Sequence, residues 1–119
     1  MPRPTDIRLH RKSRVLELVF DDGYTCNLPC EYLRVHSPSA EVQGHGPGQE
    51  VLQVGKEAVG IDGLEPSGHY ALKIRFDDGH DSGLFTWDYL YALGQRYEEN
   101  WAAYLARLKA AGHRRREAG

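Results

Sequence analysis

Short runs in which apolar and polar residues alternate dominate the first part of the chain, and this pattern predicts β-strands. Residues 7–10 and 14–20 are rich in Ile, Leu and Val and are expected to pair as a hairpin. Asp-Asp-Gly at 21–23 then favours a tight turn, because glycine adopts positive φ without steric cost. A third strand follows at 24–28, and a short helix is expected over residues 30–35.

The second part of the chain repeats this kind of pattern after an unpatterned interval. Residues 36–50 are small, polar and rich in Gly, Pro and His, and they show neither strand nor helix periodicity. Such a stretch predicts a long loop, and long loops in small domains are often functional. Strand patterns resume at 58–64 and 70–76, and a second Asp-Asp-Gly turn at 77–79 leads into a strand at 81–85.

The last predicted element is an amphipathic helix over residues 87–111, whose apolar residues recur at spacings of three and four. Thr86 is a suitable N-cap, and Gly112 is a suitable residue to end the helix. Gly94 weakens the helix and marks a point at which it can bend or divide. The basic segment 113–119 is expected to be a disordered tail.

A repeated sequence motif indicates that one structural unit is used twice. Phe-Asp-Asp-Gly occurs at 20–23 and at 76–79, and each copy is followed by a short strand and then by Tyr-Leu, at 32–33 and 89–90. The predicted fold is α+β: small antiparallel sheets built from two strand–turn–strand–helix units, with the C-terminal helix packed on the sheet. The chain of 119 residues fits one domain, predicted over 1–112.

Composition narrows the functional classes. A formal charge of −2 gives no general attraction to nucleic acid, and no apolar run approaches the roughly 20 residues of a membrane span. No signal peptide opens the chain, so a cytoplasmic protein is expected. Its two thiols, Cys26 and Cys30, should then stay reduced.

Three motifs could suggest catalysis or phosphate binding, but their sequence settings do not favour either function. The two Asp-Asp pairs precede glycines, where turns favour aspartate. His80-Asp81-Ser82 has the residue types of a hydrolytic triad but lacks the Gly-x-Ser-x-Gly setting. The glycine-rich run at 44–48 lacks the Lys-Ser/Thr of a phosphate loop. We therefore expect no enzymatic activity.

Two segments, residues 32–42 and 74–90, carry a family resemblance. Both resemble the γ-butyrobetaine hydroxylase-like N-terminal domain family, formerly a domain of unknown function, here in a stand-alone bacterial form. The resemblance implies a zinc module with three cysteines and one histidine. Ser37, Ser39, Val42 and His80 stand at those positions, so a degenerate site that binds no metal and needs no cofactor is expected.

The resemblance also implies a function. Fusions in the family suggest a non-catalytic binding or scaffold module with a protein partner in iron–sulfur protein handling or oxygenase assembly. The expected binding surface is the 36–50 loop, including His36 and His45, with His80 and the aromatic Tyr91. The alternative is a metal-binding protein that holds zinc or iron through these histidines, with or without the two thiols.

Overall fold

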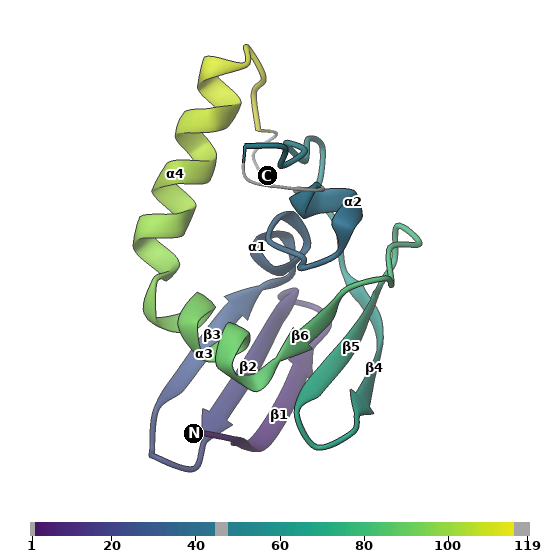
Figure 1. Cartoon of the computed structure of the whole chain (residues 1–119), viewed down its shortest axis with the longest axis vertical. Coiled ribbons are helices and arrows are strands. Elements are labelled where there is room, and N and C mark those ends of the chain that lie inside the picture. Colours follow the sequence, from purple (N-terminus) through teal and green to yellow (C-terminus); the bar gives the residue numbers. More distant parts are fainter. Residues whose placement is uncertain (1, 45–47, 116–119) are drawn as a thin grey trace.

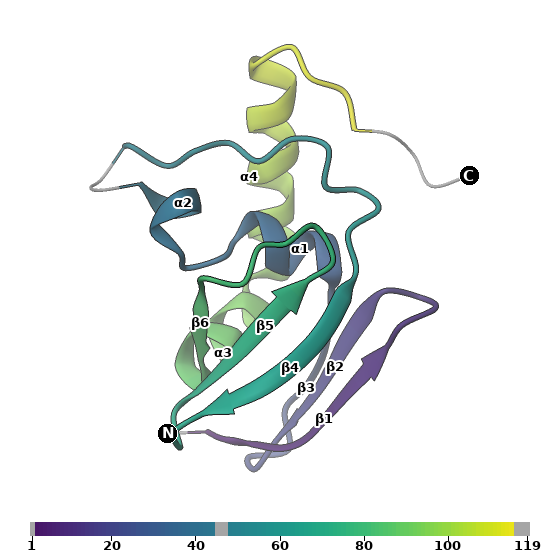
Figure 2. The ribbon, with the colours of Figure 1, turned by 90° about the vertical axis from the view of Figure 1, so that its right-hand side faces the viewer.

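The computed structural model describes residues 2–44 and 48–115, which form two antiparallel three-stranded sheets and four helices (Figures 1 and 2). The first sheet has the order β1 (Pro4–His10), β2 (Val15–Phe20), β3 (Thr25–Pro29). The second sheet has the order β4 (Ile61–Ser67), β5 (Ala71–Phe76), β6 (Leu84–Thr86). The helices are α1 (Cys30–Val35), α2 (Ala40–Gln43), α3 (Trp87–Gln95) and α4 (Tyr97–Ala110). The predicted α+β class is confirmed.

The two predicted Asp-Asp-Gly turns have the same geometry. Gly23 and Gly79 have φ of 90° and 89°, a conformation that favours glycine. In each turn the carboxylate of Asp22 or Asp78 accepts a hydrogen bond from the backbone N–H two residues later, at 2.9 and 3.2 Å. These aspartates are turn residues, and each turn joins two strands of a unit that ends in α1 or α3.

The two units also contact each other reciprocally. The Tyr32 hydroxyl donates to the Leu93 carbonyl at 2.6 Å, and the Tyr89 hydroxyl donates to the His36 carbonyl. Tyr32 and Tyr89 are separated by the same sequence offset as His36 and Leu93. Each helix of the pair therefore binds the end of the other in the same way, as in a two-fold symmetric interface.

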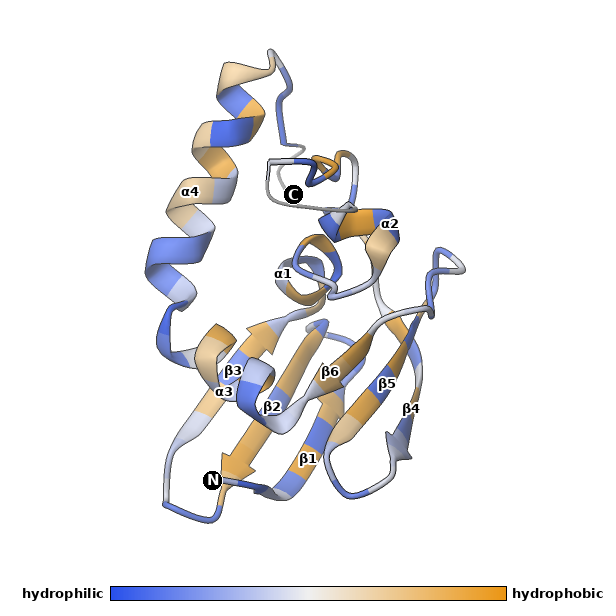
Figure 3. Ribbon diagram, viewed as in Figure 1, coloured by the Kyte–Doolittle hydropathy of each residue, from blue (hydrophilic) through white to orange (hydrophobic). Residues whose placement is uncertain are grey.

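The core lies between the units and takes side chains from both sheets and from α1 and α3. Buried apolar side chains alternate along the central strands β2 and β5, which Figure 3 shows as orange segments. The fully buried members include Leu16, Leu18, Phe20, Leu28, Tyr32, Leu33, Leu72, Ile74, Phe85 and Leu90. Among the described residues, no buried side-chain nitrogen or oxygen lacks a hydrogen-bond partner.

The helix expected over residues 87–111 is divided into α3 and α4 at Arg96, two residues beyond Gly94. Gly94 is needed for close packing: a Cβ there would lie 2.9 Å from both Cys26 Sγ and the Tyr24 hydroxyl. The N-cap prediction is confirmed, because the Thr86 hydroxyl accepts from the Tyr89 N–H.

Only α3 occupies the predicted position on the sheets, whereas α4 packs against α1 (Figure 1). Val35 of α1 meets Tyr104 and Leu108 of α4 in a second, smaller core. Within the described chain no helix has the length and apolar character that crossing a bilayer requires.

The beginning of the segment predicted as a disordered tail has defined contacts. Gly112, with φ of 78°, turns the chain back from the end of α4. Arg115 then donates two hydrogen bonds to the Glu31 carboxylate, at 2.6 and 2.8 Å, and lies 5.3 Å from the Trp101 ring centre. Glu31 is buried in α1, so this ion pair ties the chain end to the first unit.

Two further boundaries differ from the predictions. The 36–50 loop contains α2, a helix of four residues that is too short to show a periodic pattern. The strand predicted at 58–64 is displaced to β4, because a turn in which the Val59 N–H donates to the Lys56 carbonyl occupies its first residues.

Candidate functional site

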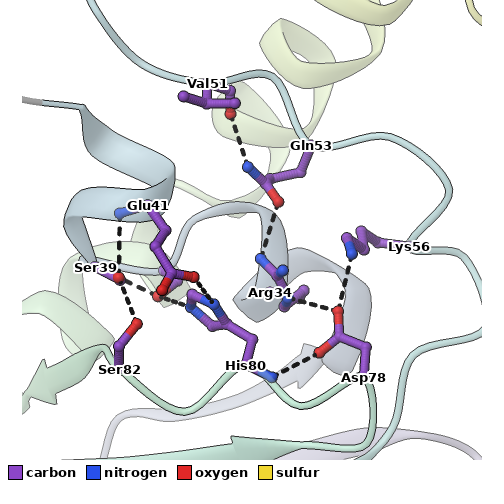
Figure 4. A network of polar contacts seen from close by, with 10 residues as sticks. Arg34, Ser39, Glu41, Val51, Gln53, Lys56, Asp78, His80 and Ser82 are labelled. Atoms are coloured by element: carbon purple, nitrogen blue, oxygen red, sulfur yellow. Dashed lines mark hydrogen bonds and ion pairs between the residues drawn. The ribbon is translucent and has the colours of Figure 1, made fainter.

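Three of the four residues at the degenerate metal positions lie within one hydrogen-bonded cluster (Figure 4). His80 follows the β5 turn, and its Nε2 lies 2.9 Å from the hydroxyl of Ser37, just beyond α1. Ser39 caps α2 by accepting the Glu41 N–H at 3.2 Å, and its hydroxyl lies 2.6 Å from that of Ser82. Ser37, Ser39 and His80 are all buried.

The hydrogen-bond partners of the two ring nitrogens determine which nitrogen of His80 carries the proton. Nδ1 lies 3.2 Å from a Glu41 carboxylate oxygen, which only accepts, so Nδ1 carries the proton. The Ser37 hydroxyl then donates to Nε2. Burial lowers the pKa of His80, and the nearby Arg34 charge lowers it further, so the ring is neutral at pH 7.

Glu41, His80 and Ser37 thus share the hydrogen-bond pattern of a serine hydrolase triad. Ser37, however, is completely buried, and its hydroxyl accepts the Ser39 N–H at 3.3 Å. The backbone of Gly83 lies so close that a Cβ added there would overlap the Ser37 hydroxyl oxygen. The Ser37 hydroxyl oxygen is therefore enclosed by protein atoms in the observed conformation.

The same cluster does not suit zinc. Val42 contributes only a buried hydrocarbon side chain, Ser37 and Ser39 contribute hydroxyls, and both ring nitrogens of His80 already have partners. Among residues 2–44 and 48–115, no group of three His, Cys, Asp or Glu side chains is placed to hold a metal ion.

Beside the cluster lies a second polar network, which was not predicted from the sequence. Arg34, almost fully buried in α1, donates to Asp78 at 2.9 Å and to Gln53 at 3.0 Å. Lys56 donates to the same Asp78 oxygen at 2.9 Å. Burial alone would raise the pKa of Asp78, but the hydrogen bonds from Lys56, the His80 N–H and Arg34 lower it to about 2. The network fastens residues 51–56 to α1 and to the second turn.

His36 lies in a different environment from His80. Its Nδ1 is 2.9 Å from the Tyr32 carbonyl, which assigns the proton to Nδ1 and leaves the lone pair on Nε2. Burial lowers the pKa of His36, and the charge of Arg107 acts in the same direction. His36 borders two adjacent hollows of about 70 and 270 Å³, between the 36–51 segment and helices α3 and α4. His45 lies outside the described residues.

Tyr91, a predicted member of the binding surface, lies at the first turn rather than beside His36 and His80. Its hydroxyl donates to Asp22 at 2.7 Å, and its ring lies 5.0 Å from that of Phe20 and 4.9 Å from that of Tyr24. Tyr91 is half-buried there, at the first turn. Arg34 and Tyr91 are as far apart in the sequence as Tyr32 and Tyr89, so they occupy equivalent positions in α1 and α3. The contact of Tyr91 with Asp22 is therefore the counterpart of the contact of Arg34 with Asp78.

The two thiols are free and lie within the core rather than beside the histidines. Cys26 packs against Gly94, and Cys30 begins α1. Burial raises the pKa of each thiol to about 11, so both are protonated at neutral pH.

Comparison with known proteins places the chain in a family. The profile of the family described as γ-butyrobetaine hydroxylase-like, N-terminal, matches residues 7–91. Among curated proteins, none matches this chain. Two solution NMR structures are similar: one is 57% identical with a TM-score of 0.84 (99% of this chain, 94% of the other), and one is 50% identical with a TM-score of 0.83 (97% and 86%).

A crystal structure of an Acidithiobacillus ferrooxidans protein with unknown function, from the DUF971 family, is also similar. It is 41% identical with a TM-score of 0.65, over 76% of this chain and 91% of the other. The family profile ends at Tyr91, so α4 lies beyond the part that it matches. The chain belongs to the γ-butyrobetaine hydroxylase-like N-terminal domain family.

Proposed function

We propose that this chain is a non-catalytic docking module that binds a protein partner through the surface between the 36–54 segment and helices α3 and α4. The observation that carries the proposal is a firmly anchored segment with exposed apolar side chains. Val51 and Val54 are 53% and 40% exposed, although their neighbours are held in place. An anchored apolar surface binds a partner without the entropic cost of ordering a loop.

The anchors come from three separate elements. The Val51 N–H donates to the Val42 carbonyl at 2.8 Å, beside α2. The Tyr104 hydroxyl of α4 donates to the Gln53 carbonyl at 2.7 Å, and Arg34 of α1 holds the Gln53 side chain. These hydrogen bonds hold the backbone at and between the exposed valines in one conformation.

The closed cluster of Ser37, His80 and Glu41 supports a role that is not catalytic. Its hydroxyl and imidazole groups satisfy one another, which leaves shape, apolar side chains and charge as the means of recognition. The family resemblance implies a partner in iron–sulfur protein handling or in oxygenase assembly, and a protein of one of these two classes is the expected partner.

Site-specific photocrosslinking in living cells tests the proposal. A benzophenone amino acid at Val51 reports on the proposed surface, and the same residue at Tyr70 is the control. Tyr70 is 57% exposed, and the turn between β4 and β5 that carries it lies at the opposite end of the molecule (Figure 1). We expect a discrete adduct only from position 51. Equal adducts from both positions, or none from position 51, would refute the proposal.

A further inference from the structure

We infer that the docking surface recognises an extended acidic segment of its partner, with two carboxylates about five residues apart. This inference rests on the proposed function and adds the chemistry of the ligand. The two hollows beside His36 are adjacent, since His36 and Gln43 border both. We call the two hollows together the groove; Arg96 and Asn100 border one of them, and Arg107 borders the other.

Two arginines stand at the ends of this groove. Arg96, the residue immediately before α4, borders the larger hollow, and Arg107, in the last turns of α4, borders the smaller one. Both side chains are exposed, and neither makes an ion pair with a carboxylate among the described residues. Glu50 also borders the smaller hollow, so the groove carries two positive charges and one negative charge.

The helix sets the spacing of the positive charges. Arg96 immediately precedes α4, and Arg107 lies eleven residues further along the chain. At a rise of 1.5 Å per residue they are separated by about 16 Å along the helix. An extended peptide advances about 3.3 Å per residue, so about five residues span this distance. Guanidinium groups favour carboxylate partners because they offer paired donors in one plane.

Between the two arginines the groove offers a hydrogen-bond acceptor. The proton of His36 is committed to the Tyr32 carbonyl, so Nε2 accepts a hydrogen bond. The field of Arg107 disfavours a second proton on this ring. A peptide backbone N–H is the matching donor. The groove therefore combines terminal charges for acidic side chains with a central acceptor for the main chain.

Fluorescence anisotropy with synthetic peptides tests the inference. The probe peptide carries two Glu residues five positions apart, separated by Gly, Ser and Thr, and the comparison peptides replace both Glu by Gln or place them two positions apart. We expect binding of the first peptide only, weakened about threefold by Arg96→Gln or Arg107→Gln and about tenfold by both. Arg75→Gln, which removes one charge from the outer face of the second sheet, should leave the affinity unchanged.

Equal binding of the three peptides, no binding of any, or equal effects of Arg75→Gln and the groove variants would overturn the inference. Crosslinking from position 51 separates this failure from that of the docking function. An adduct from position 51 that persists in the Arg96→Gln, Arg107→Gln double variant would retain docking and reject acidic recognition. Loss of the adduct in the double variant, with an unchanged adduct in Arg75→Gln, supports both.

Discussion

Replacing Asp78 by asparagine removes the charge that holds Arg34 in the protein interior while preserving the shape of the turn. The side-chain oxygen of the introduced asparagine would still accept the His80 N–H. The change therefore isolates the ion pairs with Arg34 and Lys56. The Arg34 side chain is only 8% exposed, so its guanidinium would lose its carboxylate partner in a poorly hydrated site.

The magnitude follows from the pKa of Asp78. A carboxyl group whose pKa falls from 3.8 in the unfolded chain to about 2 in the folded protein contributes about 2 kcal/mol of stability at neutral pH. This figure applies because only 24% of the Asp78 side chain is exposed. We expect Asp78→Asn to lower the free energy of unfolding by about 2 kcal/mol, measured by urea denaturation at pH 7 with tryptophan fluorescence.

The fold supplies a matched control. Asp22 occupies the equivalent position in the first turn, but it is exposed and accepts hydrogen bonds from the Tyr91 hydroxyl and the Tyr24 N–H without forming an ion pair within the described part of the chain. Asp22→Asn should lower the urea midpoint much less than Asp78→Asn. The pH dependence gives a second check: the stability contributed by the Asp78 charge is complete above about pH 4 and is lost as the pH falls towards 2, so wild type and Asp78→Asn should converge there. Equal midpoints for the two asparagine variants at pH 7 would refute the reasoning.

Four further outcomes are expected. Gly83→Ala and Gly94→Ala should each destabilise the protein by about 1–3 kcal/mol in urea denaturation, because the added methyl meets Ser37 or Cys26; wild-type stability in either would contradict the packing. Arg115→Gln leaves Glu31 buried without a cation and should increase amide hydrogen exchange in α4, whereas Arg114→Gln should not; equal exchange in the two variants would exclude the ion pair. Cys26 and Cys30 should resist a disulfide reagent at pH 8 until the protein is unfolded, because burial raises the pKa of both thiols to about 11; rapid labelling of native protein would contradict their burial. The free energy of unfolding should also decline as the pH falls below 6.5, because His36 and His80 have lowered pKa values in the folded state and bind protons more readily when unfolded. His80→Gln should make this decline smaller, and an unchanged decline would contradict the contribution of that imidazole.

The local signals in the sequence predicted most of the backbone. Asp-Asp-Gly specified both turns, and residues 30–35 form the predicted helix after Pro29, because turn and helix-start preferences act between close neighbours. The repeated motif predicted two similar units correctly. It did not predict how the units meet, because the reciprocal bonds of Tyr32 and Tyr89 depend on the packed arrangement.

The candidate site was predicted in part. Ser37, Ser39 and His80 were selected together, and the structure gathers them in one cluster. Tyr91 was assigned to the binding surface because its position on the helix suggested exposure, and the structure places it half-buried against the first turn. Arg34 gave no signal, because a lone arginine in a short helix resembles a solvated residue until its distant partners are known.

The division of the last helix shows a similar limit. Gly94 indicated a weak point, but the break at Arg96 and the turn of α4 towards α1 result from tertiary packing of Tyr104 and Leu108. The return of Arg115 to Glu31 likewise joins residues far apart in the sequence. Periodicity identifies apolar faces and does not specify which element covers them.

The cluster of Ser37, His80 and Glu41 is closed by its own hydrogen bonds, and the proposed docking function depends on this closure. The most direct test is the imidazole ¹⁵N spectrum of protein purified without a His tag, before and after one equivalent of Zn²⁺. We expect a neutral His80 with the proton on Nδ1 and unchanged shifts after the addition of Zn²⁺. New His80 resonances in slow exchange that saturate at one equivalent would contradict the closure of the cluster.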